Sequence, residues 1–198
     1  MPMPFNVSNA HWRVLPRPAF SADQKDWLTR GGSLTRRLQT LGRVDVQVVR
    51  ETVDFVWASE AHCLKTRARQ RVWAREVLLL VEGEPFIAAR SIVPLVASRS
   101  VWGGIRQLHT RSLSELLYGG AIQRSALASR PVGRRDPLQR FVRRCLAQPA
   151  LGLLPALPSI DAQPCVARRS IFMHAGEPLL VTECMLAALW TRLATHNR

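Results

Sequence analysis

The clearest hydrophobic pattern in this chain occurs twice. Residues 74–90, AREVLLLVEGEPFIAAR, and residues 167–183, ARRSIFMHAGEPLLVTE, align without a gap, and each holds an apolar run, a G-E-P turn and a second apolar run. Apolar runs of this length on either side of a glycine-containing turn predict a β-hairpin. Glycine supplies the positive φ that a two-residue turn needs, which places the turns at residues 82–83 and 175–176. We therefore expect two antiparallel hairpins.

The position of each turn also predicts which side chains face one another. In the first hairpin, Arg75 falls opposite Arg90. Two adjacent cations are unfavourable unless an anion lies between them, so this pair is a candidate anion site, although a one-residue shift in register would separate it. In the second hairpin, Arg168 falls opposite Glu183. Glu183 is either in an ordinary cross-strand ion pair or lines a cavity, and periodicity alone favours the ion pair.

Helix start and stop signals mark most of the remaining segments. A Ser or Asp cap, a Gln or Glu three residues later and a glycine at the end are typical of short helices. Valines at alternate positions of residues 44–51 predict a strand, and residues 52–57 continue extended, so we expect an early antiparallel pair there. The predicted helices cover residues 21–30, 34–41, 113–118, 136–147 and 185–196.

Length and composition favour a single domain with little metal or redox chemistry. A chain of 198 residues that is 47% apolar suits one well-packed core. Its four cysteines are scattered without a C-x-x-C pair, and its five histidines show no metal-ligand spacing, so we expect reduced thiols, no metal and a cytoplasmic setting. No apolar run approaches about 20 residues, and the first residues do not match a signal peptide.

A net charge of +14, almost all of it from arginine, indicates an anionic partner. Nucleic acid, an acidic membrane surface and a small polyanionic substrate would each suit that charge. Aromatic residues make up only 7% and no recognition motif accompanies the arginines, so we do not expect nucleic-acid binding. Seven arginines lie between residues 120 and 145, within a longer basic segment at about 120–164. They form either a solvated surface or the basis of a weak membrane-surface association.

Four segments, taken in order, resemble the chorismate pyruvate-lyase family of bacterial ubiquinone biosynthesis. They are DWLTRGGSLTRRL, VWAREVLLLVEGEPFIAARSIVP, LSELLY and GEPLLVTECML. The most specific parts are W-x-R-E followed by G-E-P and R-[ST]-[IV]-V-P, and the later G-x-P-L-L-x-T-E. The resemblance implies an α+β fold, a single domain over residues 1–198 whose antiparallel β-sheet has helices covering one face and enclosing the ligand. It implies a cofactor-independent lyase that eliminates pyruvate from chorismate and leaves 4-hydroxybenzoate, and we expect a monomer.

The family's ligand contacts can be carried over position by position. Arg75 matches the arginine that holds the ring carboxylate, and Glu183 matches the glutamate at the ring hydroxyl, so both are expected to be catalytic. The backbone at Leu34 and at Leu113 matches the flap positions that close on the ligand. The chain departs from the family's L-G-R-x-L-F, where it has LSELLY, and no family role can be carried onto the basic segment.

Alternatives stay open at this point. Glu183 is either the general base that removes the hydrogen at C4, or a group that only orients the ring hydroxyl while the enolpyruvyl methylene takes the hydrogen. Arg90 and Arg168 are secondary candidates because each is predicted beside one of the main residues. The alternative function is a non-catalytic, effector-binding domain of the same fold, as in some transcriptional regulators.

Overall fold

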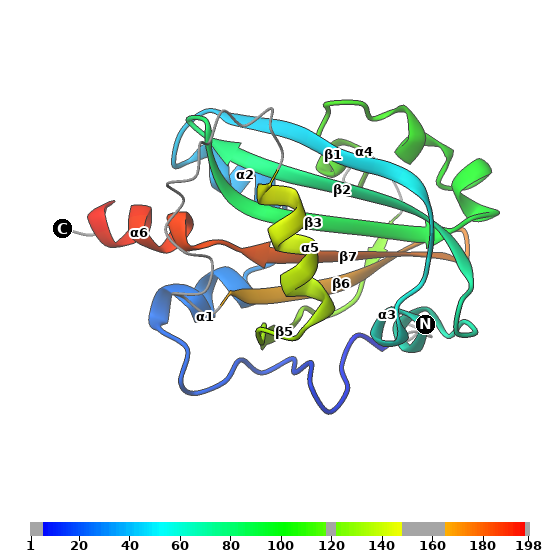
Figure 1. The fold of residues 1–198 in the computed structure, drawn as a ribbon, viewed down its shortest axis with the longest axis horizontal. Helices are drawn as coiled ribbons and strands as arrows, with labels where there is room; N and C mark the ends of the chain where they lie inside the picture. Colours follow the sequence, from blue (N-terminus) through cyan, green and yellow to red (C-terminus); the bar gives the residue numbers. More distant parts are fainter. Residues whose placement is uncertain (1–5, 118–121, 148–164, 197–198) are drawn as a thin grey trace.

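The computed structural model describes residues 6–117, 122–147 and 165–196, and within them a seven-stranded antiparallel sheet runs through the centre (Figure 1). The strand order is β1-β2-β3-β7-β6-β4, and β5 also pairs with β6. The strands are β1 (Val44–Phe55), β2 (Arg71–Val81), β3 (Glu84–Pro94), β4 (Gln123–Arg124), β5 (Ala128–Pro131), β6 (Val166–His174) and β7 (Glu177–Met185).

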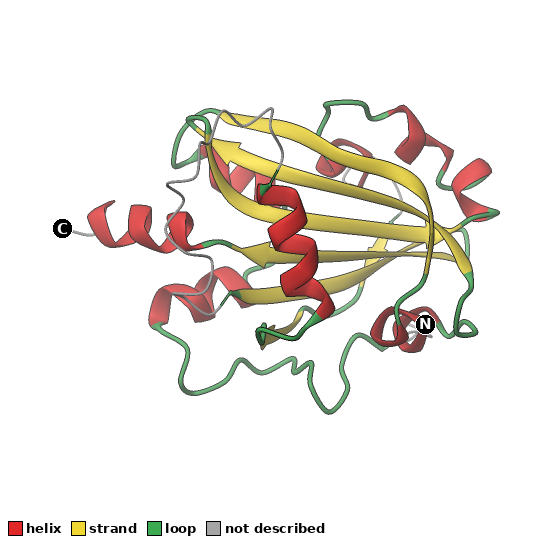
Figure 2. Cartoon of the chain, viewed as in Figure 1, coloured by secondary structure: helices red, strands yellow, loops and turns green. Residues whose placement is uncertain are grey.

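Helices pack on both faces of this sheet (Figure 2). Apolar side chains of α3 and α5 pack on one face, and those of α1, α2, α4, α6 and the 3₁₀ helices η1 and η2 pack on the other. The bounds are α1 (Ala22–Thr29), α2 (Leu34–Gln39), α3 (Ala58–Leu64), η1 (Ala97–Arg99), η2 (Gly103–Gln107), α4 (Leu113–Leu117), α5 (Pro137–Leu146) and α6 (Ala187–His196). The predicted α+β class with an antiparallel sheet is confirmed, and α3 and α5 add cover on the second face. The described part of the chain has no helix long and apolar enough to cross a membrane.

Local capping explains why most helices begin where the sequence predicted them. Ser21 accepts a hydrogen bond from the backbone N–H of Gln24, whose side chain accepts one in return from the backbone N–H of Ser21. Helix α4 is described to residue 117, and residue 118 of the predicted helix lies outside the described residues. Helix α3 was not predicted, because Trp57 precedes it in place of a polar cap and Glu60 satisfies the Trp57 N–H instead.

Both predicted hairpins form, and the pairing of β3 with β7 places them side by side. Each turn has positive φ at both central residues, 51° and 81° at Glu82 and Gly83, and 45° and 81° at Ala175 and Gly176. A type I′ turn needs this conformation at both positions, and its twist matches that of the flanking strands. The turns therefore lie where the glycines predicted them.

Register follows the prediction in the second hairpin and differs in the first. Arg168 lies opposite Glu183, as predicted. Arg75 lies opposite Ser91, whereas Arg90 lies one position further along and points to the other face of the sheet. The prediction that Arg75 and Arg90 lie side by side is therefore wrong.

A β-bulge causes this shift. Leu79 lies opposite Ile87 and Leu80 lies opposite Pro85, which leaves Phe86 as one extra residue on β3. Proline alone does not cause the bulge, because Pro178 stands at the equivalent position of the second hairpin and pairs with Met173 in regular register. The bulge also buries Phe86 completely, in the core beneath α1, α2 and α6. The bulge thus shifts the register by one residue and places the Phe86 ring in the core.

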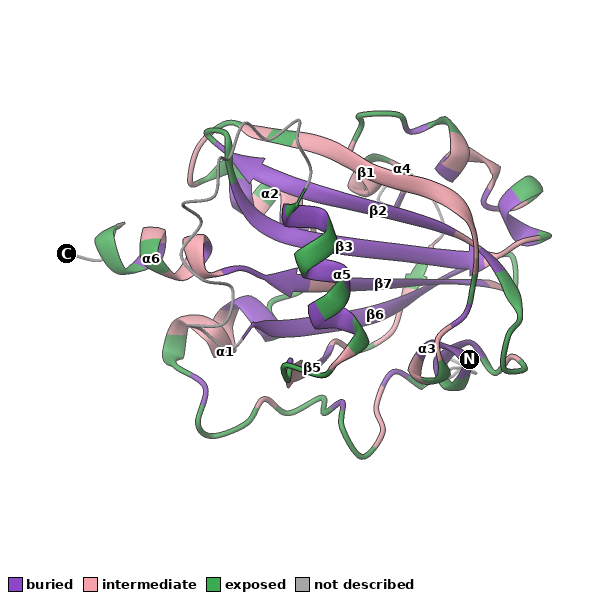
Figure 3. Cartoon of the chain, viewed as in Figure 1, coloured by how far each residue is buried: buried purple, intermediate pink, exposed green. Residues whose placement is uncertain are grey.

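The expected early pair of strands is also wrong, because residues 44–55 form the single long strand β1. β1 pairs with β2 along its whole length, with an irregularity between Val48 and Arg50 in place of a turn. As an edge strand it is half-buried, whereas the central strands are buried (Figure 3). This pairing brings Glu51 opposite Arg75.

Candidate functional site

A pocket lies between the sheet and the segments that begin α2 and α4. Leu34 is the first residue of α2 and Leu113 is the first of α4. Both line the pocket together with Arg75 of β2 and Glu183 of β7, so the structure brings together all four residues that the sequence predicted as ligand contacts. The sheet supplies most of the apolar lining, including Val77, Leu79, Ala89, Phe172 and Val181.

Strand pairing sets the distance between Arg75 and Glu183. Arg75 lies opposite Ser91, and Ser91 lies opposite Val181 on β7. Glu183 is two residues further along β7 and therefore points to the same face. With strands about 4.8 Å apart and a rise of about 3.4 Å per residue, the two Cα atoms are about 12 Å apart. This separation leaves room for a small ring between a cation and a carboxylate.

Arg75 is only 1% exposed and is held by three hydrogen bonds. Its Nε donates to Oε1 of Glu51 over 2.8 Å. Its Nη2 donates to the carbonyl oxygens of His109 and Arg111 over 2.7 and 3.1 Å. Burial lowers the pKa of Arg75 from its usual value while the Glu51 carboxylate opposes that change, and the guanidinium remains a cation at neutral pH. No described residue accepts a hydrogen bond from its Nη1.

Glu183 makes an ion pair and lines the pocket at the same time. Its Oε2 accepts a hydrogen bond from Nε of Arg168 over 2.6 Å, and its side chain remains 13% exposed. Nη1 of Arg168 donates to the carbonyl oxygens of Trp27 and Arg30, at the C-terminal end of α1, over 2.8 and 3.1 Å. Arg168 is not among the described residues that line the pocket. The two interpretations of Glu183 therefore do not exclude each other.

Hydroxyl groups join the segments that carry Leu34 and Leu113. Oγ1 of Thr35 lies 2.7 Å from Oγ of Ser112, and Oγ of Ser112 lies 2.8 Å from Oγ of Ser114. All three residues line the pocket. The sequence identified Ser112 only as a helix cap, because a contact between residues 77 positions apart leaves no local pattern.

Arg124 of β4 also lines the pocket, and the sequence did not single it out. It was one of seven arginines in a segment considered as a whole. Only the pairing of β4 with β6, in which Arg124 lies opposite Phe172, brings it to this face of the sheet. Its guanidinium lies 4.9 Å from the centre of the Phe172 ring.

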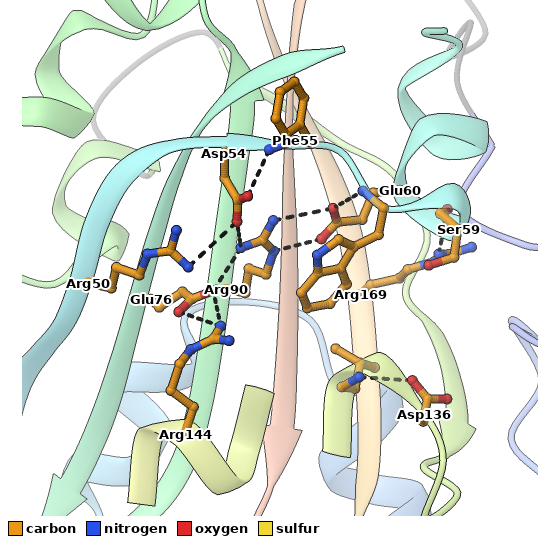
Figure 4. Close-up of polar contacts among 12 residues, drawn as sticks. Arg50, Asp54, Phe55, Ser59, Glu60, Glu76, Arg90, Asp136, Arg144 and Arg169 are labelled. Atoms are coloured by element: carbon orange, nitrogen blue, oxygen red, sulfur yellow. Dashed lines mark hydrogen bonds and ion pairs between the residues drawn. The ribbon is translucent and has the colours of Figure 1, made fainter. Parts of the chain in front are cut away.

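Arg90 lies on the opposite face of the sheet, within a buried ionic cluster (Figure 4). Its Nε donates to Oε1 of Glu60 over 2.8 Å, and its Nη1 lies 2.7 Å from Oε1 of Glu76 and 3.3 Å from Oδ2 of Asp54. Burial opposes the charge of Arg90, but these carboxylates raise its pKa above the usual value. Glu76 also accepts a hydrogen bond from Arg144 of α5. The structure thus places Arg90 between strands and helices, not in the pocket.

The described side chains that line the pocket are suited to binding an organic acid. Within the described ranges, no group of three or more His, Cys, Asp or Glu side chains could hold a metal ion. The charged residues known to line the pocket are Arg75, Arg124 and Glu183. Such a set can bind a carboxylate through charge-assisted hydrogen bonds and can hold or move a proton at another point.

Two solved structures share the fold at low sequence identity. The effector domain of PhnF from Mycobacterium smegmatis has a TM-score of 0.51 and 15% identity, covering 81% of this chain and 92% of that chain. A PhnF C-terminal domain has a TM-score of 0.52 and 13% identity, covering 80% and 94%. At such identities the likeness shows the fold alone.

Curated relatives are more similar in sequence. A probable chorismate pyruvate-lyase of Bordetella avium is 36% identical over 185 residues, covering 93% of this chain and 87% of that protein. The probable chorismate pyruvate-lyase of Bordetella pertussis is 41% identical over 170 residues, covering 85% and 84%. The family model described as chorismate lyase matches residues 7–195. The chain therefore belongs to the chorismate lyase family.

Proposed function

We propose that this protein is a chorismate lyase, which eliminates pyruvate from chorismate and leaves 4-hydroxybenzoate. One observation carries the proposal: Arg75 and Glu183, which stand in the two most specific family motifs, line one pocket of the family's fold. Leu34 and Leu113, the positions expected to close on the ligand, line the same pocket.

Arg75 binds the ring carboxylate in this proposal. Nε and Nη2 of Arg75 already donate to protein acceptors, so Nη1 is the nitrogen that donates a charge-assisted hydrogen bond to the carboxylate. Glu51 and two backbone carbonyl groups hold the side chain, so its orientation is set before the substrate arrives. The apolar strands around it keep water away, which strengthens the charge–charge contact.

Glu183 lies at the other end of the ring, where the C4 hydroxyl stands para to the carboxylate. In the elimination, the proton at C4 leaves and the C–H electron pair forms a ring double bond. The C3–O bond breaks, and the enolpyruvyl oxygen departs with its electron pair. The ring is then aromatic, and the departing enolate takes up a proton at its methylene carbon to become pyruvate. The electrons balance without an oxidant or reductant, so we propose that no cofactor takes part.

Two routes for the C4 proton fit this balance. In the first, the Glu183 carboxylate accepts the proton. In the second, the enolpyruvyl methylene takes it directly, and Glu183 only accepts a hydrogen bond from the C4 hydroxyl. Arg168 holds the carboxylate in place in both routes.

Incubation of the purified protein with chorismate, followed by assays for pyruvate and 4-hydroxybenzoate, tests the proposal. We expect the two products in equal amounts. Binding of chorismate with no product would contradict the proposal and favour a ligand-binding domain, the second candidate, which the fold shared with the PhnF effector domain supports.

We further propose that the 4-hydroxybenzoate enters ubiquinone biosynthesis and that the protein is a cytoplasmic monomer. The hypothesis of a weak membrane-surface association depends on the basic segment, of which residues 120–121 and 148–164 lie outside the described residues. Arg135 and Arg140 are exposed, whereas Arg144 bonds to buried Glu76. Salt-sensitive binding to anionic vesicles that is lost in the Arg135→Gln/Arg140→Gln double variant would support the association, and no binding by the wild type would leave a solvated surface.

A further inference from the structure

Arg124 lies on the same face of the sheet as Arg75 and reaches the pocket from the opposite edge, because β4 and β2 lie toward different ends of the strand order. Its Nε donates to Oγ of Ser170 on β6 over 3.0 Å, and its Nη1 donates to the carbonyl oxygen of Gly32 over 3.0 Å. Together with the ring of Phe172 beneath the guanidinium, these contacts fix the orientation of the side chain. Its charge is therefore positioned over β6, beside β7.

Strand pairing relates this position to Glu183. Ser170 lies opposite Val181 on β7, so it is the diagonal neighbour of Glu183, about 7 to 8 Å away. Arg75 lies in the same row as Ser170 but three strands away, about 14 Å across the sheet. The two arginines thus flank the pocket, and Glu183 lies on the Arg124 side of it.

The substrate of the proposed reaction carries two carboxylates. One is on the ring, and the other belongs to the enolpyruvyl group, which is attached at C3 next to the C4 hydroxyl. When the ring carboxylate is at Arg75 and the C4 hydroxyl is at Glu183, the enolpyruvyl group extends from a ring carbon beside Glu183. Resting on the proposed function, we infer that Arg124 binds the enolpyruvyl carboxylate.

This assignment separates the two arginines by the ligand they recognise. Both carboxylates are present in chorismate, but 4-hydroxybenzoate keeps only the one on the ring. Arg124 therefore contributes to binding of the substrate and of the departing pyruvate, and not to retention of the aromatic product. Arg75 contributes to binding of substrate and product alike.

The bond from Arg124 to Gly32 provides a competing explanation. Gly32 lies just before α2, so Arg124 could act only by holding the segment that covers the pocket. Loss of a structural contact of that kind would weaken both ligands, because the segment covers whichever ligand is bound. The ratio of the two effects is therefore the quantity to measure.

The test compares wild type, Arg124→Gln and Arg124→Lys. For each, kcat/KM for chorismate is measured by pyruvate formation, and the Kd of 4-hydroxybenzoate is measured by calorimetry. Arg124→Gln is expected to lower kcat/KM by about tenfold or more while changing the product Kd by less than about twofold. Arg124→Lys keeps the charge without the planar fork. Its kcat/KM is expected to lie between the values of the wild type and of Arg124→Gln. Arg140→Gln, on the exposed face of α5, is the matched control and should leave both quantities unchanged.

Equal weakening of chorismate and 4-hydroxybenzoate, or no effect on either, would overturn the assignment of Arg124. Failure of the proposed function gives a different result, because the wild type itself would then make no pyruvate. In that case the Kd of chorismate is measured directly, and Arg124→Gln must still weaken chorismate binding more than 4-hydroxybenzoate binding. Circular dichroism and melting curves show whether each variant is folded.

Discussion

Arg168 donates from Nε to Oε2 of Glu183 over 2.6 Å, in a cross-strand pair that is closed on the arginine side and open to the pocket on the carboxylate side. The same arginine holds two carbonyl oxygens at the end of α1. A pocket carboxylate is therefore fixed to the sheet and, through its partner, to a helix. Substitution of each member separates a chemical role from a structural one.

The first prediction concerns Glu183→Gln, which keeps the shape of the side chain and one acceptor oxygen. If Glu183 accepts the C4 proton, turnover of chorismate should fall by about 100-fold or more, because positioned general bases contribute at least that much. Binding of 4-hydroxybenzoate should persist. Substantial remaining turnover would show instead that the carboxylate only orients the hydroxyl.

The matched variant is Arg168→Gln, which leaves Glu183 without its cation. Removing one member of a buried pair typically costs about 3 to 5 kcal/mol of unfolding free energy. Both variants break the pair, but Arg168→Gln also removes the donor to the carbonyl oxygens of Trp27 and Arg30. We therefore expect Arg168→Gln to melt earlier than Glu183→Gln, with the smaller loss of turnover per folded molecule. If the Glu183→Gln protein melts early but turns over chorismate normally, Glu183 is only the structural partner of Arg168.

The second prediction concerns Arg75. Arg75→Ala should weaken both chorismate and 4-hydroxybenzoate by about tenfold or more, because the ring carboxylate is common to both and a charged hydrogen bond contributes about 1.5 to 3 kcal/mol. Arg75→Lys should recover only part of this affinity, since a single ammonium group cannot replace the bonds to Glu51 and the two carbonyl oxygens while it also donates to the ligand. Arg111→Ala is the control, because only the backbone carbonyl of Arg111 touches Arg75. If the Arg75→Ala protein binds 4-hydroxybenzoate as tightly as the wild type does, Arg75 does not bind the ring carboxylate.

The two hairpins show how far the sequence could predict the sheet. The turn of the second hairpin fixes a regular register, so the pairing of Arg168 with Glu183 followed from counting. The same count failed in the first hairpin, because the bulge at Phe86 is decided by core packing and not by the turn. Helix caps and turn glycines can be recognised from neighbouring residues in the sequence. A bulge depends on how side chains from distant parts of the chain pack in the core.

The pocket was only partly predictable for a related reason. Motif positions identified one residue on each of the strands β2 and β7, and the fold brought them to one face. Thr35, Ser112 and Arg124 reach the same pocket from segments far apart in the chain, through a 2.7 Å hydroxyl contact and a two-residue strand. Contacts between residues so far apart in the chain produce no recognisable spacing pattern in the sequence.

The third prediction concerns the hydroxyl contact between Thr35 and Ser112. Thr35→Val keeps the shape but removes the hydrogen bond that joins the segments over the pocket. A net loss of about 1 kcal/mol corresponds to about fivefold easier opening. Stopped-flow measurements should therefore show faster association and faster dissociation of 4-hydroxybenzoate. Thr40→Val, which removes a local hydrogen bond at the end of the same helix, should change neither rate; a change in dissociation alone would indicate a direct contact with the ligand.

The fourth prediction is a pH dependence of stability that comes from Cys145. This thiol is buried on α5 against the sheet, and burial, with the nearby Glu76 carboxylate, raises its pKa from 9.0 to about 12. In the unfolded chain the thiol loses its proton near 9.0, whereas the folded protein holds it until about 12. The folded state therefore binds the proton more tightly, and this contribution to stability is fully present below pH 9 and is lost as the pH rises toward 12.

Urea unfolding at pH 8 and at pH 10 should show a larger drop in unfolding free energy for the wild type than for Cys145→Ala. The comparison uses the difference between the two pH values, so the smaller side chain of the variant, which lowers stability at both, cancels. Equal drops in the two proteins would mean that the thiol ionises in the folded state as readily as in the unfolded chain.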